Sequence, residues 1–404
     1  MPMDKDVYFH KIVTLRAGKE SLQFRTSQEL FSSHETDTGT RFLLRSVIEA
    51  GYSPKAMLDM GCGYGTLGLA LKKLYPESTV EMVDRDALAI EYARRNAALN
   101  GLEGVEINGS TGYDDVKRTD FDLIVSNIPG KAGEPVIAYL LREARHYLTP
   151  GGTAAIVIVG ALEETVLKIL QETPGGEIIL RQSKPGHAVF HYKFNAKSTI
   201  PKPDGGGVER GVYHRENVTM RAAGLDYEIH TAYGMPEFDS LSYGSEMLAA
   251  GLKESRGRDI KSAAVFNPGQ GHAPVILWKL LKPDSISLVD RDLLALRYSQ
   301  LNLIRNGFPA ERIKVFHQSG AALPVRTDLF AGTLRDEGRE ANLQTLEQVT
   351  DSVSPGGMII ISGGSTQITR AVERVEAERR LRIIKRERRR GYSLLMMEYR
   401  TGNA

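Results

Sequence analysis

The chain has 404 residues, 41% hydrophobic and 25% charged, a globular composition long enough for two domains of ordinary size. Its 52 Lys and Arg residues nearly balance 50 Asp and Glu residues, so bulk charge argues neither for nor against nucleic-acid binding. The single cysteine, Cys62, excludes an intrachain disulfide. Without a signal-peptide pattern or an apolar run near the roughly 20 residues that span a bilayer, we expect a cytoplasmic protein with no membrane association.

The sequence repeats itself at a spacing of about 205 residues. Val83-Asp84-Arg85-Asp86 recurs as Val289-Asp290-Arg291-Asp292, and Pro150-Gly151-Gly152 recurs as Pro355-Gly356-Gly357. We therefore predict a tandem duplication. The first copy covers residues 1–194, a Pro- and Gly-rich linker covers 195–211, and the second copy covers 212–404.

Taken in chain order, the first copy alternates strands and helices after an N-terminal hairpin over 12–26. We predict strands over 56–60, 80–83, 121–126 and 152–159, helices over 67–74, 87–100, 135–147 and 163–171, and a closing hairpin over 177–194. This alternation predicts a mostly parallel sheet with helices on both faces. The fold class we expect is α/β, with two tandem Rossmann-like domains, each closed by an antiparallel strand and preceded by a small β extension.

A glycine turn flanked by acids is the most informative motif. The apolar strand that contains Asp59 runs into Gly61-Cys62-Gly63-Tyr64-Gly65, and Asp84 ends the following strand. Glycines let a ligand approach the backbone closely, and an acid at the next strand end can accept from ribose hydroxyls. This pattern is typical of S-adenosylmethionine sites, where Asp59 would accept from the cofactor's ammonium group. The nicotinamide dehydrogenase fingerprint is disfavoured because its third glycine falls one residue later.

Asn127-Ile128-Pro129-Gly130 follows the strand over 121–126 and indicates the reaction type. In many amino-group methyltransferases an Asn-Pro-Pro-aromatic segment at this place accepts both N–H bonds of the target amine. Here Ile128 replaces the first proline, and Gly130 replaces the aromatic residue that stacks on a flipped base.

Together with Phe31-Ser32 and Asp37-Thr38-Gly39-Thr40 ahead of an apolar helix, these motifs resemble the methyltransferase small domain superfamily. Within it the chain is similar to the tandem-domain rRNA guanine-N2 methyltransferases. In those enzymes the second domain generally carries the active site, whereas here the motifs lie in the first copy, which we expect to be the catalytic one. The resemblance implies S-adenosylmethionine as cofactor and three groups of site residues. The cofactor would contact Asp59, Gly61, Gly63, Gly65, Asp84, Ser110 and Asn127; Asn127 and Pro129 would be catalytic; and Phe31, Thr40 and Ile128 would lie at the acceptor.

The second copy is expected to be degenerate. Asn267 is taken as the equivalent of Asp59, and Ala273 as the equivalent of Gly65. Thr333 corresponds to Asn127, and Arg335 corresponds to Pro129. This copy also carries a basic cluster, from which we predict a substrate-binding loop that grips phosphates. The loop residues are Arg386, Arg388, Arg389 and Arg390. We expect the second copy to serve substrate docking or homodimerisation, and we expect no metal, because the histidines show no ligand spacing.

The sequence therefore predicts an N-methyltransferase that acts on an amino group of a base in structured rRNA. Two alternatives stay open. One is methylation of a protein side-chain amide or a small molecule, which the missing aromatic residue at position 130 favours. The other is a non-catalytic RNA-binding or assembly protein.

Overall fold

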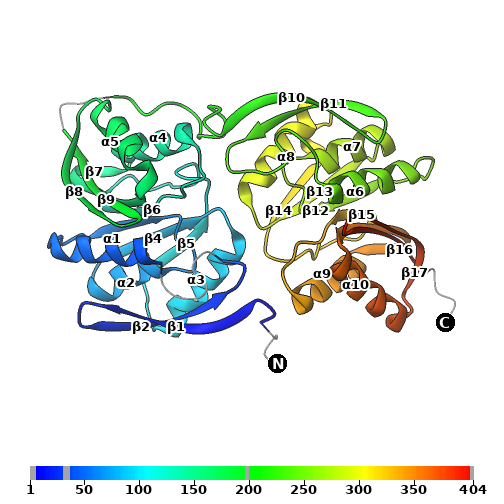
Figure 1. The fold of residues 1–404 in the computed structure, drawn as a ribbon, viewed down its shortest axis with the longest axis horizontal. Coiled ribbons are helices and arrows are strands. Elements are labelled where there is room, and N and C mark those ends of the chain that lie inside the picture. The colour runs from blue at the N-terminus through cyan, green and yellow to red at the C-terminus, as the bar shows by residue number, and fades with distance from the viewer. Residues whose placement is uncertain (1–5, 31–36, 196–199, 401–404) are drawn as a thin grey trace. The chain divides into compact units, whose positions relative to one another are not determined.

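The structure is a computed structural model that describes residues 6–30, 37–195 and 200–400. It divides into two compact units, Phe9–Tyr213 and a unit that holds residues 6–8 with 214–400. Each unit contains one seven-stranded sheet and one two-stranded sheet (Figure 1). The predicted fold class of two tandem Rossmann-like domains with small β extensions is confirmed.

The large sheet of the first unit has the strand order β5-β4-β3-β6-β7-β9-β8. All neighbours pair in parallel except β9, which runs antiparallel to β7 and β8 and so closes the sheet as predicted. The strands are β3 (Ala56–Met60), β4 (Thr79–Asp84), β5 (Val105–Gly109), β6 (Phe121–Asn127), β7 (Leu148–Val159), β8 (Gly176–Lys184) and β9 (His187–Phe194).

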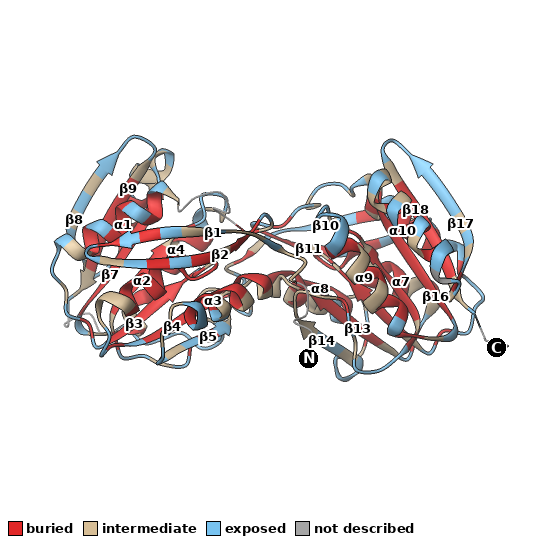
Figure 2. Ribbon diagram, turned by 90° about the horizontal axis from the view of Figure 1, so that it is seen from below, coloured by how far each residue is buried: buried red, intermediate tan, exposed pale blue. Residues whose placement is uncertain are grey.

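Helices cover this sheet in two groups. Three neighbouring helices are α1 (Thr38–Glu49), α2 (Thr66–Leu74) and α3 (Ala87–Leu99), and the other two, which pack on each other, are α4 (Glu134–Glu143) and α5 (Glu163–Gln171). Two short 3₁₀ turns complete the unit, η1 (Ala144–His146) and η2 (Gly160–Leu162). The helix predicted over 135–147 therefore ends at Glu143 and continues as η1. Every residue of β3 is buried, as expected for a central parallel strand covered on both faces (Figure 2).

The second unit repeats this plan in the order β14-β13-β12-β15-β16-β18-β17. Its strands are β12 (Ser262–Phe266), β13 (Ser285–Asp290), β14 (Ile313–His317), β15 (Thr327–Thr333), β16 (Val353–Gly364), β17 (Leu381–Arg389) and β18 (Tyr392–Tyr399). Its helices are α6 (Tyr243–Glu254), α7 (His272–Leu281), α8 (Leu293–Arg305), α9 (Arg339–Asp351) and α10 (Ser365–Glu378), with the 3₁₀ turn η3 (Ala310–Arg312). Alternate residues of β12 enter two cores: Val265 packs with residues of α6 to α8, and Phe266 with residues of α9 and α10. The sheet is thus covered on both faces.

The two-stranded sheets are the predicted N-terminal extensions, β1 (Phe9–Ala17) with β2 (Glu20–Ser27), and β10 (His214–Ala222) with β11 (Leu225–Ala232). Repeated asparagines attach them to the adjacent helix. The Asn96 side chain accepts from the backbone N–H of Arg25 at 2.7 Å and donates to its carbonyl at 3.1 Å. Asn302 makes the same pair of bonds with His230 in the second unit, at 2.8 and 2.9 Å. These amides continue the hairpin's hydrogen-bond ladder onto α3 and α8, which gives the repeated asparagines a structural role.

Part of the predicted linker is held against the first unit. The Asp114 carboxylate accepts from the backbone N–H groups of Gly207 and Val208, at 2.6 and 3.2 Å. Arg210 forms an ion pair with Glu143 at 3.0 Å. The segment from 207 onward therefore packs on the first unit rather than spanning freely between the copies.

Candidate active site

Three polar side chains gather at one edge of the first unit's sheet. Because β4, β3 and β6 are adjacent and parallel, their carboxyl ends lie side by side. Asp59 lies near the end of β3, Asp84 ends β4 and Asn127 ends β6. In parallel α/β sheets this edge is where ligands bind.

The backbone of the glycine turn is not covered by side chains at Gly61 and Gly63. The N–H groups of Gly61 and Cys62 both donate to the Val83 carbonyl, at 2.8 and 3.0 Å, which fixes the turn against β4. Gly61 and Gly63 adopt φ values of +74° and +54°, and a Cβ at either position would meet no atom within 4 Å. Gly65 plays a different part, because it caps α2 and a Cβ there would lie 2.8 Å from Leu69. The open backbone at Gly61 and Gly63 is a cradle that a ligand can fill.

Asp59 is a buried carboxylate with one unsatisfied oxygen. The residue is 1% exposed, and its Oδ2 accepts from the Gly68 N–H at 2.7 Å. Oδ1 has no hydrogen-bond partner among the described residues. Burial, with a smaller contribution from the charge of Asp84, raises the pKa of Asp59 to about 7. A cationic donor such as an ammonium group would satisfy both the free oxygen and the buried charge.

Asp84 links the glycine turn to the following helix. Its Oδ2 accepts from the Gly63 N–H at 2.8 Å and its Oδ1 from the Asp86 N–H at 2.9 Å. An acid at this strand end is where dinucleotide-binding sheets accept the hydroxyl groups of a ribose.

Ser110 follows β5, next to Asp84, whose carbonyl accepts from the Ser110 N–H at 2.9 Å. Ser110 is 2% exposed, and its hydroxyl donates to the Gly112 carbonyl at 2.7 Å and accepts from the Asp115 N–H at 3.1 Å. These bonds hold the loop that follows β5 in its conformation.

The side chain of Asn127 is held from behind by the start of α1. Its Nδ2 donates to Asp37 Oδ2 at 2.9 Å and to Thr40 Oγ1 at 3.1 Å. Thr40, predicted to lie at the acceptor, thus contacts Asn127 directly. Ile128 as a whole is 2% exposed, so its side chain is buried away from any ligand, and the Pro129 carbonyl accepts from the Ala132 N–H at 3.1 Å. Phe31 lies outside the described residues.

Asp37 is the residue at this site that the sequence analysis missed. It was noted only as part of a segment ahead of a helix. The signal was available, because an aspartate followed by Thr38, a glycine and Thr40 before an apolar helix is typical of an N-cap. The structure confirms the cap through the bond from the Thr40 N–H to Asp37 Oδ2, at 3.0 Å.

The second copy requires a correction of register. Asp59 pairs with Met82 of β4, and the residue that holds this place in β12 is Val265, opposite Leu288. Asn267 is therefore the equivalent of Gly61 and not of Asp59, and its N–H donates to the Val289 carbonyl just as that of Gly61 does to Val83. Likewise Gly271, which caps α7, is the equivalent of Gly65, instead of Ala273. Matching Asn to Asp by chemical similarity had broken the 206-residue spacing.

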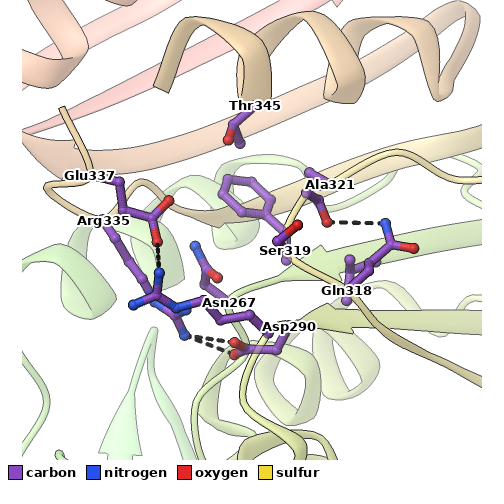
Figure 3. A pocket seen from close by; sticks show the side chains of 12 residues that line it. Asn267, Asp290, Gln318, Ser319, Ala321, Arg335, Glu337 and Thr345 are labelled. Atoms are coloured by element: carbon purple, nitrogen blue, oxygen red, sulfur yellow. Dashed lines mark hydrogen bonds and ion pairs between the residues drawn. The ribbon is translucent and has the colours of Figure 1, made fainter. Parts of the chain in front are cut away.

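The equivalent site of the second copy is filled by its own side chains (Figure 3). Asn267 donates to the Thr333 carbonyl at 2.9 Å across the space that is open beside Gly61. Arg335, at the position of Pro129, donates to both carboxylate oxygens of Asp290, at 2.7 and 3.0 Å. What remains is a cavity of about 20 Å³, enough for about one water molecule. The second copy thus has Val265 in place of the buried Asp59, and its own side chains close the cradle.

The basic loop residues lie on the β17–β18 hairpin, at the sheet edge. Because Tyr392 pairs with Gly364, the turn lies at the carboxyl end of β16. Two of the four predicted arginines have neighbours: Arg386 donates to Thr369 at 2.8 Å, and Arg390 stacks on and donates to Tyr243. The other two, Arg388 and Arg389, are exposed and have no acidic partner in the part of the chain that the structure describes.

Residues 6–30, 37–195 and 200–400 contain no group of three His, Cys, Asp or Glu side chains placed to hold a metal ion. None of the helices in these ranges is both long and apolar enough to span a membrane.

The sheet order, the glycine turn and the three polar strand ends define a protein with the class I methyltransferase fold. A family model, the methyltransferase small domain, matches residues 21–180. The uncharacterized protein YbxB of Bacillus subtilis is 32% identical over 146 residues, 36% of this chain and 72% of YbxB. The chain belongs to the methyltransferase small domain family, as its motifs predicted.

Other similarities concern rRNA-modifying enzymes. Ribosomal RNA small subunit methyltransferase C of Hahella chejuensis is 36% identical over 142 residues, 34% of this chain and 40% of that protein. The match thus spans less than half of that relative's length. A Thermus thermophilus 16S rRNA N2 methyltransferase, solved with AdoMet and guanosine, has a TM-score of 0.65 at 17% identity. That similarity covers 97% of this chain and 99% of the other, so the two share the tandem fold along their whole length.

Proposed function

We propose that this chain is an S-adenosylmethionine-dependent methyltransferase whose first unit methylates an amino group of a base in structured rRNA, of the guanine-N2 type. The observation that carries the proposal is the arrangement of Asn127, whose amide is held at the end of β6 beside the glycine turn and the two carboxylates. The family model covers all of these residues. The rRNA methyltransferases among the relatives support the choice of acceptor.

The first unit fits the cofactor. When bound, S-adenosylmethionine supplies a methyl group carried on a positively charged sulfur. The unsatisfied Oδ1 of Asp59 suits the ammonium group, and the bare backbone at Gly61 and Gly63 suits the amino-acid tail. Asp84, at the end of β4 beside the glycine turn, suits the ribose hydroxyls.

Acceptor binding falls to Asn127 and its neighbour. The Asn127 Oδ1 and the Ile128 carbonyl accept the two N–H bonds of the target amine and turn its lone pair towards the methyl carbon. With S-adenosylmethionine bound, transfer would form the C–N bond at the expense of the C–S bond, leave a neutral thioether and release one proton from the nitrogen to solvent. No strong base is required. Orientation of this kind can be worth roughly 7–11 kcal/mol of the barrier.

The second unit serves to dock the substrate. Its own site is closed by Arg335 and Asn267, whereas the exposed Arg388 and Arg389 offer donors to phosphates. Homodimerisation is the alternative use of this unit, and a sedimentation measurement of the free chain and its RNA complex separates the two.

The test is transfer of a radiolabelled methyl group from S-adenosylmethionine to ribosomal subunits that lack the modification. Label in the rRNA at an exocyclic guanine amine supports the proposal, and Asn127→Ala should lower that transfer at least about tenfold while cofactor affinity is kept. Label in ribosomal protein or in a small molecule would instead establish the alternative acceptors. RNA binding without either cofactor binding or transfer would leave a non-catalytic assembly protein.

A further inference from the structure

We propose that Asp37 is a positioning residue that fixes which end of the Asn127 amide faces the acceptor. This inference rests on the proposed function, because it concerns the same transfer. It adds a residue from outside the three strand ends and a physical reason for the preference for amine acceptors.

The hydrogen bonds assign the orientation of the amide. A carboxylate offers only acceptors, so the group of Asn127 that faces Asp37 must be its NH₂. Both protons of that group are engaged, one by Asp37 Oδ2 at 2.9 Å and the other by Thr40 Oγ1 at 3.1 Å. The Asn127 Oδ1 is therefore turned away from α1 as a pure acceptor. An acceptor oxygen at this place selects a ligand with N–H bonds.

Asp37 is itself held in place. Its Oδ2 caps α1 by accepting from the Thr40 N–H at 3.0 Å. Gly39 allows the close packing around it, because a Cβ at Gly39 would lie 2.8 Å from Asp37 Oδ2 and 2.7 Å from Cδ2 of His187 at the start of β9. The carboxylate is thus confined between the helix start and the closing hairpin of the sheet.

Without Asp37 the amide can turn over. In the flipped state its NH₂ group would face the target amine, where two donors oppose each other and the lone pair loses its alignment. We expect Asp37→Ala to lower kcat for methyl transfer at least tenfold and to change the Kd for S-adenosylmethionine less than twofold. Asp37→Asn, whose side-chain oxygen can still accept from Asn127 and cap the helix, should recover most of the lost turnover.

A double-mutant cycle separates positioning from general stability. In an Asn127→Ala background, Asp37→Ala should change turnover less than twofold, since no amide is left to orient. The matched control is Ser242→Ala, which removes the N-cap at the equivalent position of α6 in the second unit. It should lower the melting temperature about as much as Asp37→Ala while leaving turnover unchanged. Additive losses in the cycle would overturn the proposal.

A measurement without turnover keeps this inference distinct from the proposed function. The side-chain amide signal of Asn127 in a ¹⁵N–¹H spectrum, assigned by its loss in Asn127→Ala, should shift and exchange faster with water in Asp37→Ala but not in Ser242→Ala. An unchanged signal would overturn the role of Asp37 even if methyl transfer to rRNA is observed. If the signal changes in a protein that methylates no acceptor, the contact between Asp37 and the Asn127 amide is supported and the proposed function is contradicted.

Discussion

Arg335 donates to both carboxylate oxygens of Asp290, at 2.7 and 3.0 Å, and so occupies the acid that corresponds to Asp84 of the first copy. In the first copy the residue at the position of Arg335 is Pro129, which has no charge to offer. The arginine that neutralises the strand-end carboxylate in the second copy therefore has no counterpart at position 129 of the first copy.

This contrast predicts one cofactor site per chain. Calorimetric titration with S-adenosylmethionine should give a stoichiometry near one, and Asp84→Asn should weaken binding at least about tenfold. The matched change Asp290→Asn should leave the Kd and the stoichiometry unaltered. It should lower the free energy of unfolding by about 1–3 kcal/mol, below the 3–5 kcal/mol of a fully buried pair, since the Arg335 side chain is 32% exposed. Two sites per chain, or a loss of binding in Asp290→Asn, would show that the second copy still binds cofactor.

Cofactor affinity should depend on pH through Asp59. Its pKa is raised to about 7 by burial, and only the carboxylate form attracts an ammonium group, so the association constant should rise up to about tenfold per pH unit below 7 and level off above it. Free protein should show the opposite trend in stability. The stabilisation that follows from a raised carboxyl pKa is complete below about pH 4 and is lost as the pH rises through 7.

Titration calorimetry between pH 5.5 and 8 measures this effect. Asp59→Asn should bind weakly and without pH dependence, whereas Asp84→Asn should bind weakly and keep it. The buried His191 does not interfere, because burial lowers its pKa to about 4, below the window. Affinity that is flat with pH in the wild type would mean that Asp59 does not bind the ammonium group.

The bare backbone at Gly61 can be tested with a matched glycine. Gly61 and Gly51 have φ values of +74° and +68°, and a Cβ at either would meet nothing within 4 Å. Alanine at each position should therefore cost a similar amount of stability, roughly 1–2 kcal/mol for a left-handed residue. Only Gly61→Ala should also weaken S-adenosylmethionine binding, by at least about tenfold, because its methyl group fills the cradle. Equal affinity in the two variants would place the cofactor elsewhere.

The sequence predicted the fold because its signals are local and repeated. Strands such as β3 and the turn at Gly61 follow from an apolar run and from the need for left-handed backbone, and the repeat at Asp84 and Asp290 predicted two copies. The correspondence of Asp59 with Val265 was missed because Asn267 was matched to Asp59 by chemical similarity, although the spacing of 206 residues between Asp84 and Asp290 already assigns Val265.

Contacts between segments that are distant in the chain could not be predicted from the sequence either. Asp37 lies 90 positions before Asn127, and Arg335 lies 45 positions after Asp290, so neither partner could be matched without the fold. The buried state of Ser110 shows the same limit: its position after β5 was predicted, but the bonds that commit its hydroxyl to Gly112 and Asp115 were not.

RNA docking by the second unit should depend on the arginines at the end of β17. We expect Arg388→Ala/Arg389→Ala to weaken binding to ribosomal RNA and to reduce the slope of log K against log salt by about 1–2, since each phosphate contact contributes roughly 0.7–0.9. The matched control is Arg312→Ala/Lys314→Ala, which removes two exposed charges, one at the end of η3 and one in β14, at the opposite edge of the same sheet. Filter binding at salt concentrations from about 50 to about 300 mM measures both slopes. If the two double variants lose the same slope, the effect is one of net charge and the β17–β18 hairpin is not the docking surface.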